Sequence, residues 1–227
     1  EKNEVFSIVG PNGAGKSTIF NVISSFYKPS QGQIFFDVQD ITATRPDEKA
    51  KLGIARTFQN IELFEHSSVL QNLLIGRTIH NKHTVFRQFL FDKTVRNSEI
   101  AHREAAEKVI DFLELAHYRD DLIANLPYGV RKKVELARAL CAEPSLLLLD
   151  EPASGLNPEE TEEVGHWIED IRHDLGITVV MIEHDMSLVT EVSDRVLALS
   201  EGKVIAQGTA EEVQNNADVV SAYLGSA

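Results

Sequence analysis

The sequence predicts an α/β fold with a mostly parallel β-sheet, a small antiparallel β layer and an inserted helical subdomain. Two observations support this prediction. The runs Leu146–Leu149 and Ile177–Ile182 are apolar or β-branched throughout, which is typical of parallel strands buried on both faces. A glycine-containing turn, Gly10–Gly15, connects the first apolar run of the chain to a helical pattern. At 227 residues, the chain is long enough for one large domain with a subdomain.

The first part of the chain contains short strands. Val5–Val9 is predicted to be a strand, and Lys16–Phe26 is predicted to be the helix after the glycine turn. Ile34–Phe36 is predicted to be a strand of the antiparallel layer, and Ile54–Phe58 is another predicted strand.

The middle of the chain is helical and more polar. In Ser98–Ala116, small and apolar side chains recur at helical spacing, and a basic helix, Val130–Cys141, precedes the leucine strand. Because this helical block lies inside an α/β frame, it is predicted to be an insertion and not a separate domain. The expected parts are an α/β core at about residues 1–66 and 143–227, and a helical subdomain at about residues 67–142.

The last part alternates helices and strands. A helix is predicted from Pro158, where Asn157 is the N-cap and Glu159 and Glu160 complement the helix dipole. A hairpin and a final helical segment follow. Their bounds are Arg195–Leu199 and Lys203–Gln207 for the hairpin, and an end at Tyr223-Leu224-Gly225 for the helix.

Composition and charge restrict the class of protein. The net charge of −13 argues against a nucleic-acid binder, which normally presents a basic face. The single cysteine, Cys141, excludes an internal disulfide and fits a reducing cytoplasm. It is interpreted as a small buried apolar residue of a helix. No apolar run approaches the ~20 residues that cross a bilayer, and because the first residues lead directly into a strand we expect no signal peptide. We therefore expect any membrane role to come through a partner.

The glycine turn predicts a phosphate-binding loop. Residues 10–17 fit the pattern G-x-x-x-x-G-K-[ST] between a strand and a helix, which is the context that this motif requires. The glycines let backbone N–H groups face a phosphate chain, and the helix N-terminus adds the positive end of its dipole. We expect Lys16 to reach the β- and γ-phosphates and the Ser17 hydroxyl to bind Mg²⁺. The residues expected to contact nucleotide are Gly10, Pro11, Asn12, Gly13, Ala14, Gly15, Lys16, Ser17 and Thr18.

Two carboxylates, Asp150 and Glu151, follow the leucine strand directly. Open α/β sheets bind ligands at the carboxyl ends of their strands. We expect Asp150 to hold Mg²⁺, directly or through water, and Glu151 to orient and deprotonate an attacking water. The alternative, two solvated loop acids, fits poorly with four preceding leucines.

These motifs together resemble the ATPase subunits of ABC transporters over essentially the whole chain. The resemblance implies a P-loop NTPase (RecA-like) fold and adds site residues. Gln59, in GIARTFQN, resembles the glutamine that binds Mg²⁺ or the attacking water and senses the membrane subunit. His184, in MIEHDM, resembles the switch histidine that contacts the γ-phosphate, although by itself it also fits a structural histidine. Asn157 ends a loop similar to the D-loop, where the family usually has Asp.

The signature turn departs most from the family pattern LSGGQ. The corresponding residues are Leu126, Pro127, Tyr128, Gly129 and Val130. Pro127 removes a hydroxyl and an N–H, whereas Gly129 is kept and is expected to open a helix that faces nucleotide on a partner subunit. The cations of Arg131–Lys133 lie near the same helix end, where each opposes the dipole by ~0.3–1 kcal/mol. ATP on a partner would offset that cost; a solvated basic face is the alternative.

Five segments together resemble the branched-chain amino acid importer ATPases. They are RTFQNIELF, LPYG, DEPASGLNPEE, IEHDM and AYLG. The resemblance implies ATP hydrolysis that powers uptake of branched-chain or related amino acids, with ATP and Mg²⁺ as cofactors. The implied partners are a second ABC ATPase subunit, transmembrane permease subunits and, indirectly, a solute-binding protein, with no nucleic acid. The implied location is peripheral, at the cytoplasmic face of the inner or plasma membrane.

Two further expectations come from the family. Its members stack adenine on an aromatic residue upstream of the phosphate loop, so we expect N-terminal strands and this aromatic residue to be missing from residues 1–227, which should then bind ATP weakly. Apolar residues near Gln59 are predicted in part to receive a helix of the membrane subunit. They are Ile61, Leu63, Phe64, Phe86, Phe89, Leu90 and Phe91, and for Val85–Phe91 a local core is an equal alternative.

Two other functions compete with the importer ATPase. A soluble ABC ATPase that acts on nucleic acid or ribosomes would usually carry two cassettes, a long coiled coil or a basic face, and the chain shows none of these. A non-hydrolysing subunit that only completes a partner's site is the other alternative. The presence of Lys16, Asp150, Glu151 and His184 argues against it.

Overall fold

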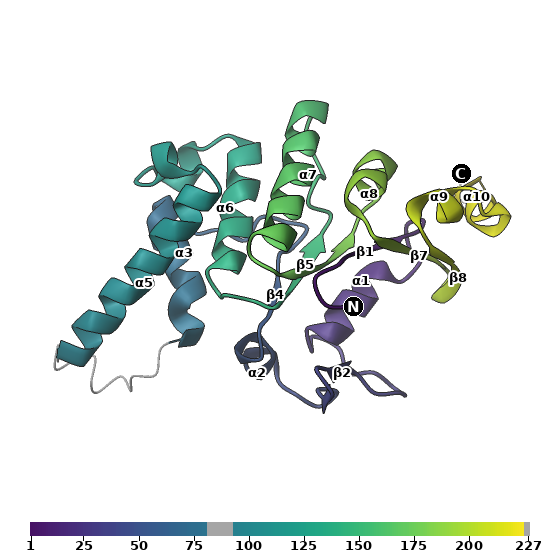
Figure 1. Ribbon diagram of the computed structural model, residues 1–227, viewed down its shortest axis with the longest axis horizontal. Helices are drawn as coiled ribbons and strands as arrows, with labels where there is room; N and C mark the ends of the chain where they lie inside the picture. Colours follow the sequence, from purple (N-terminus) through teal and green to yellow (C-terminus); the bar gives the residue numbers. More distant parts are fainter. Residues whose placement is uncertain (81–92, 225–227) are drawn as a thin grey trace. The chain divides into compact units, whose positions relative to one another are not determined.

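The computed structural model describes residues 1–80 and 93–224 (Figure 1). The chain divides into two compact units, one formed by Glu1–Gln59 with Ser145–Ala227 and the other by Asn60–Pro144. In the part of the chain that is described, no helix combines the length and the apolarity needed to span a membrane.

The larger unit contains a six-stranded sheet with the strand order β4-β5-β6-β1-β7-β8. The strands are β1 (Val5–Val9), β4 (Ile54–Arg56), β5 (Leu146–Asp150), β6 (Thr178–Ile182), β7 (Arg195–Ser200) and β8 (Lys203–Gly208). The first five strands in this order, β4-β5-β6-β1-β7, pair in parallel, and β8 pairs antiparallel with β7. The predicted α/β fold with a mostly parallel sheet is confirmed.

A separate two-stranded antiparallel sheet forms the small β layer. It pairs β2 (Phe35–Phe36) with β3 (Gln39–Asp40), so the strand predicted at 34–36 is one residue shorter. The strand predicted at 54–58 ends at Arg56 and lies at the edge of the main sheet, parallel to β5. Gly53, at φ +94°, lies directly before β4, and its carbonyl accepts a hydrogen bond from the Ser145 amide at 2.9 Å. This contact joins the starts of β4 and β5.

Apolar strands fill the core of this unit. Leu147–Leu149 and Val179 are at most 1% exposed, as expected for strands covered on both faces. Figure 1 shows α7 (Pro158–His173) and α8 (Met186–Val192) on one side of the sheet and α1 (Lys16–Ile23) on the other. Helix α1, which was predicted to reach Phe26, ends at Ile23, because Ser25 adopts a left-handed φ of +62°.

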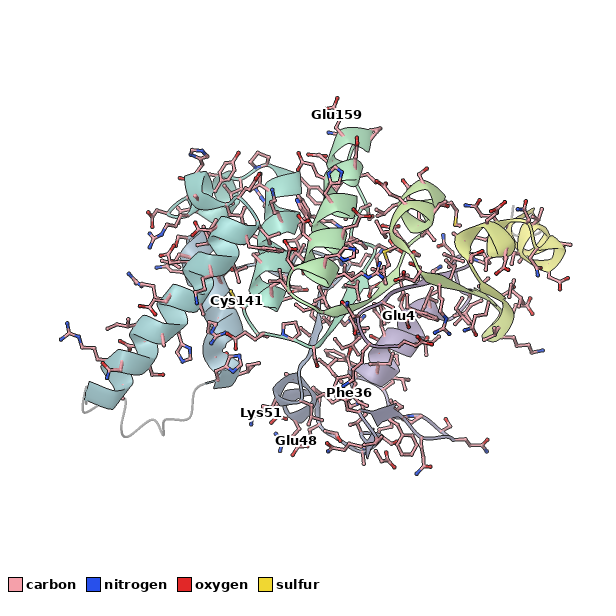
Figure 2. All side chains as sticks on the ribbon, viewed as in Figure 1. Glu4, Phe36, Glu48, Lys51, Cys141 and Glu159 are labelled. Atoms are coloured by element: carbon pink, nitrogen blue, oxygen red, sulfur yellow. The ribbon has the colours of Figure 1, made fainter. Side chains whose placement is uncertain are left out.

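The predicted cap of α7 is confirmed. The Asn157 side chain accepts a hydrogen bond from the Glu160 amide, and the Glu160 carboxylate accepts one from the Asn157 amide, both at 3.0 Å. Pro158 takes the first helical position, and Glu159 extends from this end of the helix in Figure 2. The remaining helices of the unit are α2 (Pro46–Lys51), α9 (Ala210–Gln214) and α10 (Ala217–Leu224).

The smaller unit is helical in its described residues. Its elements are α3 (Val69–Gly76), η1 (Arg77–His80), α5 (Lys93–Phe112), η2 (Ala116–Tyr118), η3 (Ile123–Asn125) and α6 (Tyr128–Leu140). Helix α5 ends at Phe112 and not at Ala116, because Glu114 has a left-handed φ of +54°. Helix α6 begins two residues before the predicted Val130. Cys141 is buried, as predicted, but it is the C-cap residue of α6 and not part of the helix itself (Figure 2).

Candidate active site

The phosphate loop connects β1 to α1 and needs glycine at specific positions. Gly10, Gly13 and Gly15 have φ values of +149°, +81° and +97°, which L side chains rarely adopt. A Cβ atom on Gly10 would lie 2.2 Å from the Leu199 carbonyl oxygen, so the loop presses against β7. The Gly202 amide also donates to the Ala14 carbonyl at 3.0 Å. The loop is therefore held in place by the neighbouring strand and hairpin.

The Lys16 ammonium folds over this loop. It donates to the carbonyl oxygens of Gly10 at 2.6 Å and Pro11 at 3.1 Å. Burial lowers the pKa of Lys16, while the negative charges of Glu151 and Asp150 act in the opposite direction. The structure thus brings the predicted lysine into the electrostatic field of both predicted carboxylates.

Asp150 is fixed by a residue that sequence reasoning missed, Arg56. Their side chains are 7% and 9% exposed, and Arg56 Nη2 lies 2.7 Å from Asp150 Oδ2. Arg56 Nη1 donates to Asn21 Oδ1 at 2.8 Å. Three rings surround the cation at 5.1–5.9 Å: Phe20, Phe26 and Phe58. The signal was present in the sequence, since a lone arginine ends an apolar strand three residues before Gln59.

Gln59 and Glu151 lie side by side. Gln59 Nε2 donates to Glu151 Oε2 at 2.9 Å. Glu151 has a left-handed φ of +50°, which is unusual for a non-glycine residue, and it follows the last residue of β5, Asp150. The structure therefore joins two predicted site residues that are far apart in sequence.

His184 follows β6 at the carboxyl edge of the sheet, where Asp150 and Glu151 also lie. Strands β5 and β6 are neighbours, and Asp150 is in register with Ile182, two residues before His184. The imidazole is largely exposed, with Nδ1 3.3 Å from Glu183 Oε2. Its position permits contact with a ligand at the carboxyl edge of the sheet.

The oxygen atoms at this edge fit Mg²⁺. Ser17 is exposed at the start of α1, and Asp150 uses Oδ2 for Arg56. Within residues 1–80 and 93–224, no group of three or more His, Cys, Asp or Glu side chains could hold a metal ion. Mg²⁺ commonly binds through one or two carboxylates together with substrate phosphates and waters. Asp150 supplies a carboxylate, and the Ser17 hydroxyl and the Gln59 amide supply further oxygen donors.

The signature turn lies in the smaller unit. Helix α6 begins at Tyr128, after Pro127 at the N-cap position, so Gly129 is the second helical residue and does not open the helix. Arg131 donates to the carbonyl oxygens of Leu126 at 2.8 Å and Ala124 at 2.7 Å.

Lys132 is buried, and its ammonium lies 5.9 Å from the centre of the Tyr128 ring. Arg131 and Lys132 thus lie in the first turns of α6, at the helix end where they were predicted, and the alternative of a solvated basic face is wrong for the buried Lys132. Backbone carbonyls and an aromatic ring stabilise these two charges within the unit itself.

The apolar residues after Gln59 are partly exposed. Phe64 is 57% exposed, and Ile61 and Leu63 are half-buried. A pocket within the smaller unit is lined by Asn60, Ile61, Leu63, Glu65, Ile123, Tyr128 and Arg131. The predicted residues Phe86, Phe89, Leu90 and Phe91 lie outside the described residues.

Two protein-family models match the chain. The model described as ABC transporter matches residues 1–154, which is more than half of the chain. The model described as branched-chain amino acid ATP-binding cassette transporter matches residues 203–227.

Curated relatives are similar along nearly the whole chain. The high-affinity branched-chain amino acid transport ATP-binding protein LivG of Escherichia coli (strain K12) is 38% identical over 224 residues, which cover 99% of this chain and 88% of LivG. BraF of Pseudomonas aeruginosa, described in the same words, is 37% identical over 227 residues, which cover 100% of this chain and 89% of BraF.

The fold is also that of a solved cassette. The ADP conformation of MJ1267, an ATP-binding cassette of an ABC transporter, has a TM-score of 0.85 at 34% sequence identity and covers 99% of this chain and 89% of that one. These similarities agree with the geometry of the phosphate loop and of the carboxylates that follow β5. The chain therefore belongs to the ABC transporter family, as one of its ATP-binding and ATP-hydrolysing subunits.

Proposed function

We propose that this chain hydrolyses ATP to power an importer of branched-chain or related amino acids, as a peripheral subunit at the cytoplasmic face of the membrane. The observation that carries the proposal is the similarity to LivG over 99% of the chain, together with a phosphate loop and two carboxylates in one compact unit. The match of the C-terminal segment to a branched-chain amino acid transporter model supports the same solute class.

The reaction is transfer of the γ-phosphoryl group to water, in which the protein contributes positioning and electrostatic stabilisation. Gly10–Gly15, through the backbone N–H groups that all of them except Pro11 carry, and the N-terminus of α1 bind the phosphate chain, together with Ser17 and Thr18. Lys16 exchanges the two loop carbonyls for phosphate oxygens. Mg²⁺, held by Ser17, Asp150 and Gln59, would neutralise charge on the β- and γ-phosphates.

The remaining residues act on the attacking water and on the transferred group. Glu151 accepts the proton of the water, and Gln59, already hydrogen-bonded to Glu151, orients both. His184 donates to the γ-phosphate from the end of the neighbouring strand. The strained backbone of Glu151 supports this assignment, since such conformations cluster where function fixes a side chain.

We further propose that the ATP sites are shared between paired subunits. Leu126–Val130 and Asn157 would contact ATP bound to a second ABC ATPase subunit, of the same or a related chain. The partly exposed Ile61, Leu63 and Phe64 would receive a helix of a transmembrane permease subunit, which links the chain indirectly to a solute-binding protein.

The test is Glu151→Gln in the full-length chain, assembled with its transporter partners. We expect ATP binding to persist and turnover to fall by at least about 100-fold, because the base is lost while the phosphate contacts remain. Glu169→Gln, which changes an exposed acid near the C-terminal end of α7, is the matched control and should hydrolyse ATP normally. Normal turnover by Glu151→Gln would refute the assigned base.

The solute class has a separate test. In the reconstituted complex with its solute-binding protein, leucine, isoleucine or valine should stimulate hydrolysis more than a basic amino acid such as lysine. Equal stimulation by lysine would refute the proposed solute class while leaving the assignment of the ATP site intact.

A further inference from the structure

Glu183 is a fully buried carboxylate at the end of β6, with 0% of its side chain exposed. Oε1 accepts a hydrogen bond from the Ala153 amide at 3.0 Å. Oε2 accepts from the amides of His184 at 2.7 Å and Asp185 at 3.3 Å. Burying a carboxylate is strongly unfavourable unless hydrogen bonds replace its water, and here backbone N–H groups from two different loops do so.

These bonds tie the two loops that carry the catalytic side chains. Ala153 belongs to the turn that begins at Glu151 and is closed by the bond from the Ser154 amide to the Glu151 carbonyl, at 3.1 Å. The Glu151 amide also donates to the Ile182 carbonyl at 2.9 Å. The turn is thus held at two points by consecutive residues at the end of β6. These bonds explain why Glu151 keeps its left-handed backbone, since such a conformation persists only where the surrounding structure fixes it.

We propose that Glu183 is a positioning residue for ATP hydrolysis, whose carboxylate holds Glu151 and His184 in one fixed mutual arrangement. This inference rests on the proposed roles of Glu151 and His184. Each oxygen of Glu183 binds a different loop: Oε1 accepts from the turn after Glu151, and Oε2 accepts from the backbone of His184 and Asp185. The base and the group that contacts the γ-phosphate therefore share one anchor and are displaced together when it is lost.

Glu183→Gln separates this role from that of a merely stabilising buried acid. Glutamine has nearly the same volume, but it carries one acceptor oxygen and an NH₂ group that only donates. Whichever way the amide is turned, the NH₂ group faces backbone N–H groups on one side, so one of the two loops is released. The phosphate loop keeps its own contacts, so ATP binding should not change.

The experiment measures kcat and KM for MgATP, together with Tm, in the assembled transporter. For Glu183→Gln we expect kcat to fall by about 10- to 100-fold with KM within about threefold of wild type, because displacements near 1 Å can cost this much in rate. The control is Val164→Ala, a buried change on α7 in the same unit, which should lower Tm and leave kcat within about twofold. In a Glu151→Gln background, Glu183→Gln should cause little further loss, because the base that it positions is already absent.

The inference is overturned if Glu183→Gln keeps kcat within about twofold of wild type, or if its loss of kcat is matched by Val164→Ala at an equal loss of Tm. If Glu183→Gln does not fold, Glu183→Asp is judged by the same criteria, since it keeps the charge and shortens the reach to Ala153. Normal turnover by Glu151→Gln would instead overturn the proposed function. Loss of turnover by Glu151→Gln with normal turnover by Glu183→Gln would overturn only the role of Glu183.

Discussion

Removing the charge of Arg56 should leave Asp150 buried without its ion-pair partner. Arg56→Met keeps most of the side-chain volume among the three phenylalanine rings but deletes the contact at 2.7 Å. Both side chains are less than a tenth exposed, and breaking a buried pair on one side typically costs about 3–5 kcal/mol. For a chain of this length, each kcal/mol corresponds to about 2–4 °C in Tm, so we expect a loss of roughly 6–20 °C.

A thermal melt of the full-length chain measures this loss, and a double-mutant cycle assigns it to the pair. Asp150→Asn removes the negative charge that Arg56 neutralises. In that background Arg56→Met should cost at least about 1 kcal/mol less than in wild type, because no buried charge is left unpaired. Arg56→Lys should recover only part of Tm, since a lysine cannot contact Asp150 and Asn21 at the same time with a planar fork.

Two results would refute the reasoning. A fall in Tm below about 3 °C for Arg56→Met would show that the pair is worth no more than an exposed one. Strictly additive losses in the cycle would show that Arg56 stabilises the fold through its rings alone and does not hold Asp150 in place.

Three further perturbations have clear expected results. Gly10→Ala should lower Tm by more than Gly13→Ala. A Cβ on residue 10 would lie 2.2 Å from a backbone oxygen, whereas a Cβ on residue 13 meets no atom and adds only the ~1–2 kcal/mol of left-handed strain. Equal losses of Tm would contradict the close packing of the phosphate loop. Cys141 should not react with thiol reagents at pH 8 until the chain unfolds, since burial raises its pKa to about 12 and the thiolate forms only near that pH; rapid labelling of the folded chain would contradict this. Phe64→Asp should leave Tm within about 2 °C and weaken co-purification with the permease. The control Val38→Asp, at an apolar residue that is even more exposed, should leave co-purification unchanged. Intact assembly of Phe64→Asp would contradict the docking proposal.

The local parts of the site were predictable because each is encoded by neighbouring residues. The phosphate loop, the carboxylates after the leucine strand and the cap at Asn157 all follow from short patterns whose physical requirements are strict. The end of α5 was not predictable in this way, because the apolar spacing continues to Ala116 while a left-handed backbone at Glu114 has already ended the helix.

The roles of Arg56 and Glu183 depend on strand order, which no local pattern contains. Arg56 meets Asp150 only because β4 lies beside β5, and Glu183 reaches Ala153 only because β6 lies on the other side of β5. A sequence shows that a charged residue ends an apolar strand. It does not show which neighbouring loop that charge will hold.

The strand order also sets the time at which the site can form during synthesis. Strand β1, which ends in the phosphate loop, is synthesised before both of its neighbours in the sheet, β6 and β7, and β6 begins only at Thr178. At roughly 5–20 residues per second, this apolar strand waits on the order of ten to thirty seconds without a partner. The nucleotide-binding motif is therefore made before the strands that support it. Until β6 and β7 have been synthesised, β1 is a site for aggregation or for chaperone binding.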